Sequence, residues 1–184
     1  MKNLISALLL FFICSAQTCS SQDEPNVVSN EYESCCGTQP VEFTSGKAYA
    51  YVPNVFTPNG DNINDVFMPY VNEDVLEVRA FTILSAKGDT IVFQRPFFNY
   101  KDINEYAWKG VRSDGSRYTG LFKYKMQILN SERVLKIVEG QACVIQCGTD
   151  AKVFKSKEGC FYPVQAAKNG TLDKSISIAE KDCF

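Results

Sequence analysis

The chain has 184 residues and a formal net charge of −2, and 45% of its residues are hydrophobic while 22% are charged. These values are typical of a globular protein with one domain of ordinary size, and they argue against wholesale disorder. No basic run marks a nucleic-acid-binding surface, so we expect no nucleic-acid partner. The sequence contains no histidine, which removes the commonest general base and the commonest zinc ligand.

Residues 1–18 have the pattern of a signal peptide. Met1-Lys2-Asn3 is a short positive segment, and the apolar run from Leu4 to Ile13 has the length of a signal-peptide core but is too short to span a bilayer. Cleavage before Gln17 would give a simple secreted or periplasmic protein. Cleavage before Cys19 would instead leave that cysteine to be acylated. We therefore expect an exported protein, either a lipoprotein of the outer membrane or cell surface, anchored through a lipid on Cys19, or a periplasmic or secreted one.

Residues 19–47 are predicted to form a polar tether and an N-terminal segment, a loop or a short edge strand, that carries two adjacent cysteines. The sequence has eight cysteines; Cys14 is lost with the signal peptide and Cys19 is the lipidation candidate. The six that remain are Cys35, Cys36, Cys143, Cys147, Cys160 and Cys183. An even number suits three disulfides in an oxidising compartment. Because adjacent cysteines cannot easily bond to each other, one plausible arrangement ties the N-terminal loop to the C-terminal region.

Residues 48–140 read as a succession of strands and turns. The expected strands are Ala48 to Phe56, Val75 to Leu84, Thr90 to Phe93, a short strand around Trp108, Leu121 to Leu129, and Arg133 to Val138. The segment Leu121 to Leu129 alternates most clearly, which is typical of a half-buried antiparallel strand. Its expected inner face carries Phe122, Tyr124, Met126 and Ile128. With Trp108 as a core residue, this pattern predicts an all-β antiparallel β-sandwich.

Residues 141–184 form a different kind of segment. They contain four of the cysteines and few periodic apolar positions, so they cannot bury much core on their own. We expect a cysteine-rich C-terminal extension that disulfides hold against the sandwich, each contributing about 2–4 kcal/mol.

The segment Val52 to Phe67 carries a motif, P-N-V-F-T-P-N-G-D-N-I-N-D-V-F. It resembles the opening motif of the gliding motility-associated C-terminal domain, which is also the type B sorting domain of type IX secretion. Trp108-Lys109-Gly110 and the strand from Tyr118 to Met126 resemble later landmarks of the family. Two departures are Asn62, where the family has a second glycine, and Ala86-Lys87-Gly88, where it has Arg-Trp-Gly. The resemblance covers about residues 50 to 140.

The resemblance implies an immunoglobulin-like sandwich in a non-catalytic binding or structural module, linked to type IX secretion or gliding machinery. Its partner would be a protein or glycan at the cell envelope. A sorting domain usually ends its chain, whereas more than forty residues follow residue 140 here. We therefore do not expect this copy to act as a sorting signal.

Five oxygen-bearing side chains lie close together in the motif: Asn59, Asp61, Asn62, Asn64 and Asp65. Oxygen ligands at this density could hold Ca²⁺, the one cofactor considered, in a calcium-dependent surface adhesion module. The same residue types also shape consecutive turns through side-chain to backbone hydrogen bonds. A third reading, a small exported hydrolase with scattered acids as its catalytic groups, has no motif in its favour, and no catalytic residue is assigned.

Overall fold

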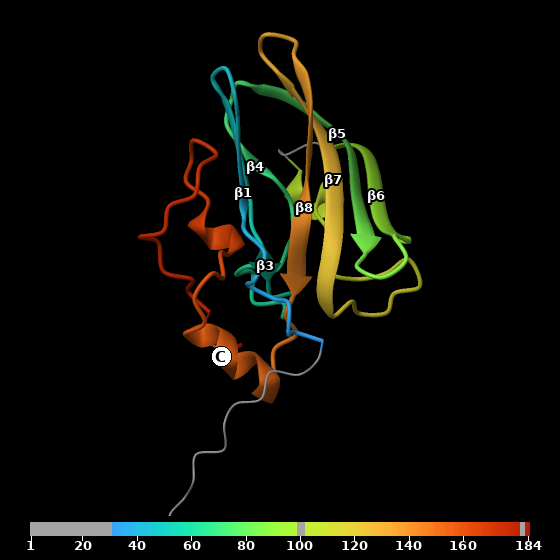
Figure 1. The fold of residues 1–184 in the computed structure, drawn as a ribbon, viewed down its shortest axis with the longest axis vertical. Helices are drawn as coiled ribbons and strands as arrows, with labels where there is room; N and C mark the ends of the chain where they lie inside the picture. Colours follow the sequence, from blue (N-terminus) through green and yellow to red (C-terminus); the bar gives the residue numbers. More distant parts are fainter. Residues whose placement is uncertain (1–30, 99–101, 181–182) are drawn as a thin grey trace, which may run out of the picture.

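The computed structural model describes residues 31–98, 102–180 and 183–184, which form two β-sheets and a C-terminal cap (Figure 1). Sheet A has the strand order β1 (Val41–Ser45), β2 (Ala48–Val52), β4 (Tyr70–Val71). Sheet B has the order β3 (Val55–Phe56), β8 (Leu135–Val144), β7 (Gly120–Asn130), β5 (Val75–Ser85), β6 (Ile91–Phe98). The expected all-β class is confirmed, and β5 is an interior strand as its apolar composition indicates.

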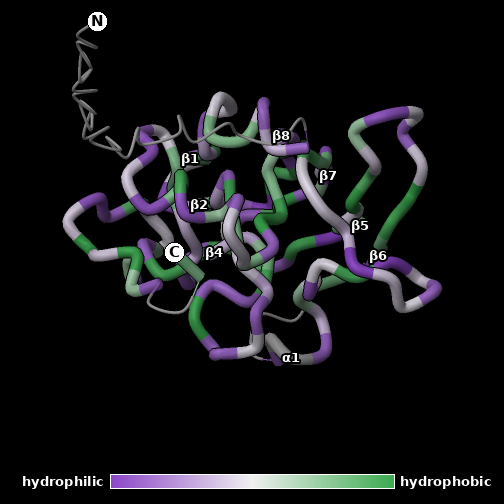
Figure 2. The backbone as a smooth tube through the Cα atoms, turned by 90° about the horizontal axis from the view of Figure 1, so that it is seen from below, coloured by the Kyte–Doolittle hydropathy of each residue, from purple (hydrophilic) through white to green (hydrophobic). Residues whose placement is uncertain are grey.

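Inner side chains of both sheets share one hydrophobic core. The alternation predicted for β7 is confirmed, since its buried residues are Phe122, Tyr124, Met126 and Ile128. Trp108 is fully buried, and its indole N–H donates to the carbonyl of Val111 at 2.7 Å. The rings of Phe67 and Trp108 meet the ring of Phe122 at centroid distances of 4.8 and 4.9 Å. Figure 2, seen from below, shows β1, β2 and β4 of sheet A beside β8, β7, β5 and β6 of sheet B.

The chain crosses from sheet A to sheet B at Pro53-Asn54, so the expected single strand from Ala48 to Phe56 is two strands, β2 and β3. Proline has no N–H to donate to a sheet, which favours a break at this point. After the crossing, β3 runs parallel to the end of β8, with Val55 opposite Cys143. The expectation of a purely antiparallel sandwich is therefore wrong for this one pair, while the other strand pairs are antiparallel.

The prediction of a short strand around the tryptophan is also wrong. Helix α1 (Ile103–Tyr106) precedes it, and Trp108 forms only an isolated bridge to Phe67. The chain turns away at Gly110, whose φ is +71°. A β-carbon at Gly110 would lie 3.0 Å from a side-chain carbon of Pro58, so the tight turn beside the motif favours glycine at this position.

The C-terminal extension packs as a cap against one end of sheet B. Strand β8 passes through residue 140 and ends at Val144, after which come two 3-10 helices, η1 (Thr149–Lys155) and η2 (Pro163–Gln165). A second hydrophobic cluster joins the cap to that end of the sheet, with members Tyr32, Val55, Leu121, Cys143, Ile145, Phe154 and Tyr162 among others.

Three disulfides fasten the cap, and all six predicted cysteines take part. The pairs are Cys35–Cys143, Cys36–Cys160 and Cys147–Cys183. The adjacent Cys35 and Cys36 reach separate partners, and Cys160 lies in the extension, so the expected tie between the N-terminal loop and the C-terminal region is confirmed. Three disulfides indicate an oxidising compartment, the periplasm or the cell exterior. Across the described residues, no helix has the length and apolarity needed to cross a membrane.

Candidate functional site

The motif loop, residues 57–65, folds into consecutive turns that its own side chains stabilise. The carboxylate of Asp65 accepts two backbone hydrogen bonds, from the N–H of Gly60 at 2.7 Å and from that of Asn62 at 2.6 Å. Asp61 accepts a hydrogen bond from the N–H of Ile63 at 2.8 Å. The spacing of aspartates and asparagines in the motif therefore has a local structural role. In tight turns some backbone N–H groups have no backbone acceptor, and these side chains accept their hydrogen bonds instead.

Asn62 and Asn64 suit the backbone conformation of the loop. Asn62 has a φ of +68° and Asn64 one of +52°, both in the left-handed region. Glycine adopts this region most easily and asparagine is the best tolerated of the larger residues, so asparagine fits both positions of the loop.

The five calcium candidates do lie together in this loop, but the side-chain oxygens of Asn59, Asp61, Asn64 and Asp65 accept hydrogen bonds from protein donors. Both oxygens of Asp65 accept backbone N–H groups, and those of Asp61 accept one backbone and one side-chain donor, the amide of Asn59 at 3.0 Å. Among the residues that the structure describes, no group of three or more acidic, cysteine or histidine side chains could hold a metal ion. This geometry favours the turn-forming interpretation of the motif.

Asn64 faces the cap rather than solvent. Its side-chain amide donates to the carbonyl of Ile178 at 2.9 Å and to the carboxylate of Glu180 at 3.0 Å, while its amide oxygen accepts from the N–H of Val164 at 2.9 Å. Asn64 is buried. One asparagine of the motif therefore joins the loop to two separate segments of the extension.

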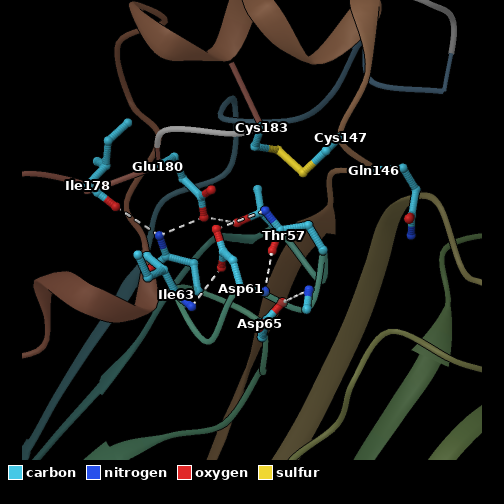
Figure 3. Close-up of a disulfide and its surroundings, with 12 residues drawn as sticks. Thr57, Asp61, Ile63, Asp65, Gln146, Cys147, Ile178, Glu180 and Cys183 are labelled. Carbon is cyan, nitrogen blue, oxygen red and sulfur yellow. Dashed lines mark hydrogen bonds between the residues drawn. A yellow bond between two sulfur atoms is a disulfide. The ribbon is translucent and has the colours of Figure 1, made fainter.

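Glu180 is the acidic residue that the sequence analysis missed. Its side chain is buried, and one oxygen accepts hydrogen bonds from the hydroxyl of Thr57 and the amide of Asn64 (Figure 3). The other oxygen is buried without a partner among the described residues. Burial raises the pKa of Glu180, the two hydrogen bonds oppose this, and the negative charges of Asp61 and Asp65 add to the increase. No sequence pattern could indicate this residue, because 123 positions separate it from Thr57.

Asn54, also in the motif, fastens the cap from the other side. Its amide donates to the carbonyls of Thr38 and Gly159, each at 2.6 Å, and its oxygen accepts from the N–H of Phe161 at 2.7 Å. The side chain is fully buried. The motif is thus a structural junction where the sandwich, the N-terminal loop and the extension meet, held by the nearby disulfides.

Two clefts flank the motif loop. One, of about 380 Å³, lies between the loop and the turn after Trp108, and its lining includes Asn59, Asn62, Lys109, Gly110 and Arg117. The other, of about 440 Å³, lies between the loop and the cap, where Ile63, Val164 and Ala179 contribute. Lys109 and Arg117 are exposed and bring positive charge to the first cleft. Residues of the motif loop and the Lys109-Gly110 turn therefore line one cleft.

The predicted signal peptide and the lipidation candidate Cys19 lie outside the described residues. No family model, no curated protein and no solved structure matches the chain.

Proposed function

We propose that the chain is a non-catalytic binding module of the bacterial cell envelope, with an immunoglobulin-like sandwich and a relationship to the gliding motility-associated C-terminal domain. Exported through its signal peptide and anchored by a lipid on Cys19, it would bind a protein or glycan beside the type IX secretion or gliding machinery. The observation that carries this proposal is that the side chains of the motif loop make hydrogen bonds within the loop itself. Its carboxylates hold the loop in shape and leave a rigid surface between two clefts.

The first cleft supports a binding role because the charged side chains on its wall are exposed to solvent. Lys109 and Arg117 are exposed on its wall, and Arg117 makes a hydrogen bond with Gln146 at 3.3 Å. The loop that forms the opposite wall is fixed by its own hydrogen bonds and by the cap. A preorganised site loses less conformational entropy on binding than a mobile one. The positive charge suits a ligand with carboxylate or phosphate groups.

The test of binding uses isolated envelope fragments and the purified chain. We expect the chain to cosediment with the fragments, and the double variant Lys109→Glu with Arg117→Glu to reduce the bound fraction at least about tenfold, since both cations are reversed. Lys152→Glu, an exposed change on η1 away from this cleft, is the matched control. A chain that does not bind the fragments, or a double variant that binds like the control, would refute this role for the cleft.

The anchor is tested separately by intact-mass spectrometry of membrane-fraction protein, with and without reduction. We expect the mass of an acylated Cys19 and a gain of six hydrogens on reduction of the three disulfides. A mature chain that starts at Gln17 without a lipid would rule out anchoring while leaving the binding role to its own experiment.

A calcium-dependent adhesion module is the second candidate, and one observation favours it. The unpartnered oxygen of Glu180 is buried near the negative charges of Asp61 and Asp65, and a cation would relieve that arrangement. If calcium binds there, the melting temperature should rise in calcium relative to chelator, because a ligand of the folded state alone stabilises it. Glu180→Gln should remove the rise. Equal melting temperatures in calcium and chelator would eliminate this candidate.

A further inference from the structure

Two cations without an ion-pair partner meet at the cleft between the motif loop and the turn after Trp108. Lys109 and Arg117 line this cleft, and both are exposed. Within the part of the chain that the structure describes, neither forms a salt bridge. Asp65 also lines the cleft, but both of its oxygens accept backbone N–H groups. The charged groups that stay available to a ligand here are therefore positive.

The guanidinium of Arg117 has one hydrogen-bonded nitrogen and one free edge. Its Nη1 donates to the side-chain oxygen of Gln146 at 3.3 Å. Gln146 is itself held, because its side-chain amide donates to the carbonyl of Tyr118 at 2.8 Å and its backbone N–H donates to the hydroxyl of Tyr32 at 3.0 Å. Among the described residues, Nε and Nη2 of Arg117 have no acceptor. These two nitrogens form one edge of the guanidinium, which can bind a carboxylate or a phosphate through two parallel hydrogen bonds.

The wall of the cleft that the motif loop forms carries side-chain amides. Asn62 is exposed, and its side-chain amide makes no hydrogen bond with the residues that the structure describes. The amide of Asn59 donates to Asp61 at 3.0 Å, which uses one of its N–H groups. Gly60 lies between these asparagines, and a β-carbon there would meet nothing within 4 Å. Amides both donate and accept, so this wall matches a ligand that carries hydroxyl groups, which do the same.

The apolar part of the lining is small. It consists of Pro58, Val66 and Val111, and the lining includes no aromatic residue. Protein–protein contacts obtain most of their energy from aromatic and large apolar anchors that fill desolvated pockets, and this lining offers no such pocket. A neutral saccharide would match the amides but would leave both cations without a counter-charge. The lining therefore favours a hydrophilic ligand that is negatively charged.

We propose that this cleft binds an anionic saccharide of the cell envelope. The acidic group, a carboxylate or a phosphate, would bind the free edge of Arg117, and Lys109 would add a second positive charge. Hydroxyl groups of the sugar would bind the amides of Asn59 and Asn62. This inference rests on the proposed binding function and names the class of ligand for it.

The size of the cleft agrees with a short part of a longer saccharide. Its volume of about 380 Å³ lies near the lower end of the range for ligand sites, so it holds about one or two sugar rings. Gly60, Lys109 and Val111 on its walls are exposed. A polysaccharide can therefore enter and leave the cleft at its open sides.

The test measures binding of four polymers to the disulfide-bonded chain, made with Cys19→Ser so that no lipid attaches. Polygalacturonate carries carboxylates and phosphomannan carries phosphates, and we expect at least one of them to bind. Polygalacturonate with its carboxyl groups reduced is the neutral control, and polyglutamate carries carboxylates without sugar hydroxyls. Both controls should bind at least about tenfold more weakly than the preferred saccharide, because each lacks one of the two kinds of contact. The preference between polygalacturonate and phosphomannan identifies the acidic group.

Three variants connect binding to the cleft. Arg117→Gln should raise the dissociation constant at least about tenfold, because it removes the charge and the free edge. Asn62→Gly should raise it about three- to tenfold, and glycine keeps the φ of +68° without strain. Lys152→Gln is the matched control, since it removes one exposed positive charge from η1 and should leave binding unchanged. Thermal melts check that each variant is folded.

The outcomes separate this inference from the proposed function. Polyglutamate that binds as tightly as the saccharides would show that charge alone is recognised, and the inference would be wrong. If neither anionic saccharide binds while envelope fragments still cosediment with the chain, the ligand class is wrong and the binding function stands. Loss of that cosedimentation after protease treatment of the fragments would assign the cleft to a protein partner instead. A chain that binds neither the polymers nor the fragments removes both proposals.

Discussion

The carboxylate of Glu180 accepts a hydrogen bond from the hydroxyl of Thr57, a residue 123 positions earlier in the chain. This contact places the C-terminal extension directly on the motif loop, and Asn64 reinforces it by donating to the same oxygen. The motif loop is therefore partly covered by a segment that lies far from it in the sequence.

The pH dependence of this contact has a definite sign. The folded-state pKa of Glu180 lies above the ordinary value of 4.5, so the folded protein holds the proton more tightly than the unfolded chain. Its stabilising contribution is fully present below pH 4.5 and is lost as the pH rises through the folded-state pKa. In the absence of calcium, Glu180→Gln should raise the unfolding free energy by about 1 kcal/mol at pH 8. The difference from wild type should vanish near pH 4, as thermal melts across that range would show. A constant difference at all pH values would mean that Glu180 does not titrate in this way.

Removal of the disulfide between Cys147 and Cys183 should loosen the end of the extension without unfolding the sandwich. The bond closes a loop with a sequence separation of 36, and losing such a bond costs about 2–4 kcal/mol. In the double variant with serine at both positions, hydrogen exchange should accelerate at Val164, whose N–H is bonded to Asn64. Amides of the core strand β7 should keep their protection. Equal loss of protection in β7 would show that the cap and the sandwich unfold as one unit.

Tyr124 and Gly140 form a second pair whose coupling can be measured. The hydroxyl of Tyr124 is buried and has no hydrogen-bond partner among the described residues, so Tyr124→Phe should be neutral or stabilising by up to about 1 kcal/mol. Gly140→Ala should destabilise by about 1–3 kcal/mol, because its β-carbon would lie 2.5 Å from that hydroxyl. The double variant should recover most of the loss in denaturant titrations. Additive effects would show that the hydroxyl is not what excludes a side chain at residue 140.

Phe122 is the central ring of the aromatic core. It contacts the rings of Phe56, Phe67, Trp108 and Tyr118. Phe122→Ala should reduce the unfolding free energy by about 3–5 kcal/mol, measured by denaturant titration of the oxidised chain. Lys125→Ala, an exposed change on the same strand, should alter it by less than about 0.5 kcal/mol. Similar losses for the two variants would place Phe122 outside the core.

Local patterns in the sequence were sufficient for the long strands β5, β7 and β8 and for the chemistry of the cysteines, but not for β1, the break between β2 and β3, or the segment around Trp108. The alternation of Phe122, Tyr124, Met126 and Ile128 determined which face of β7 is buried, because successive side chains of a strand point to opposite sides. Cysteine parity and the adjacency of Cys35 and Cys36 indicated three bonds that reach across the chain. The oxygen-rich run from Asn59 to Asp65 was recognisable as a turn or an ion site, and its composition permitted both.

Only the tertiary structure decided how the distant parts meet. Which cysteine pairs with which, the parallel contact of β3 with β8, and the docking of Glu180 on Thr57 join residues that are far apart in sequence. Such contacts depend on how the layers pack, and the local alternation of apolar and polar residues carries no information about them.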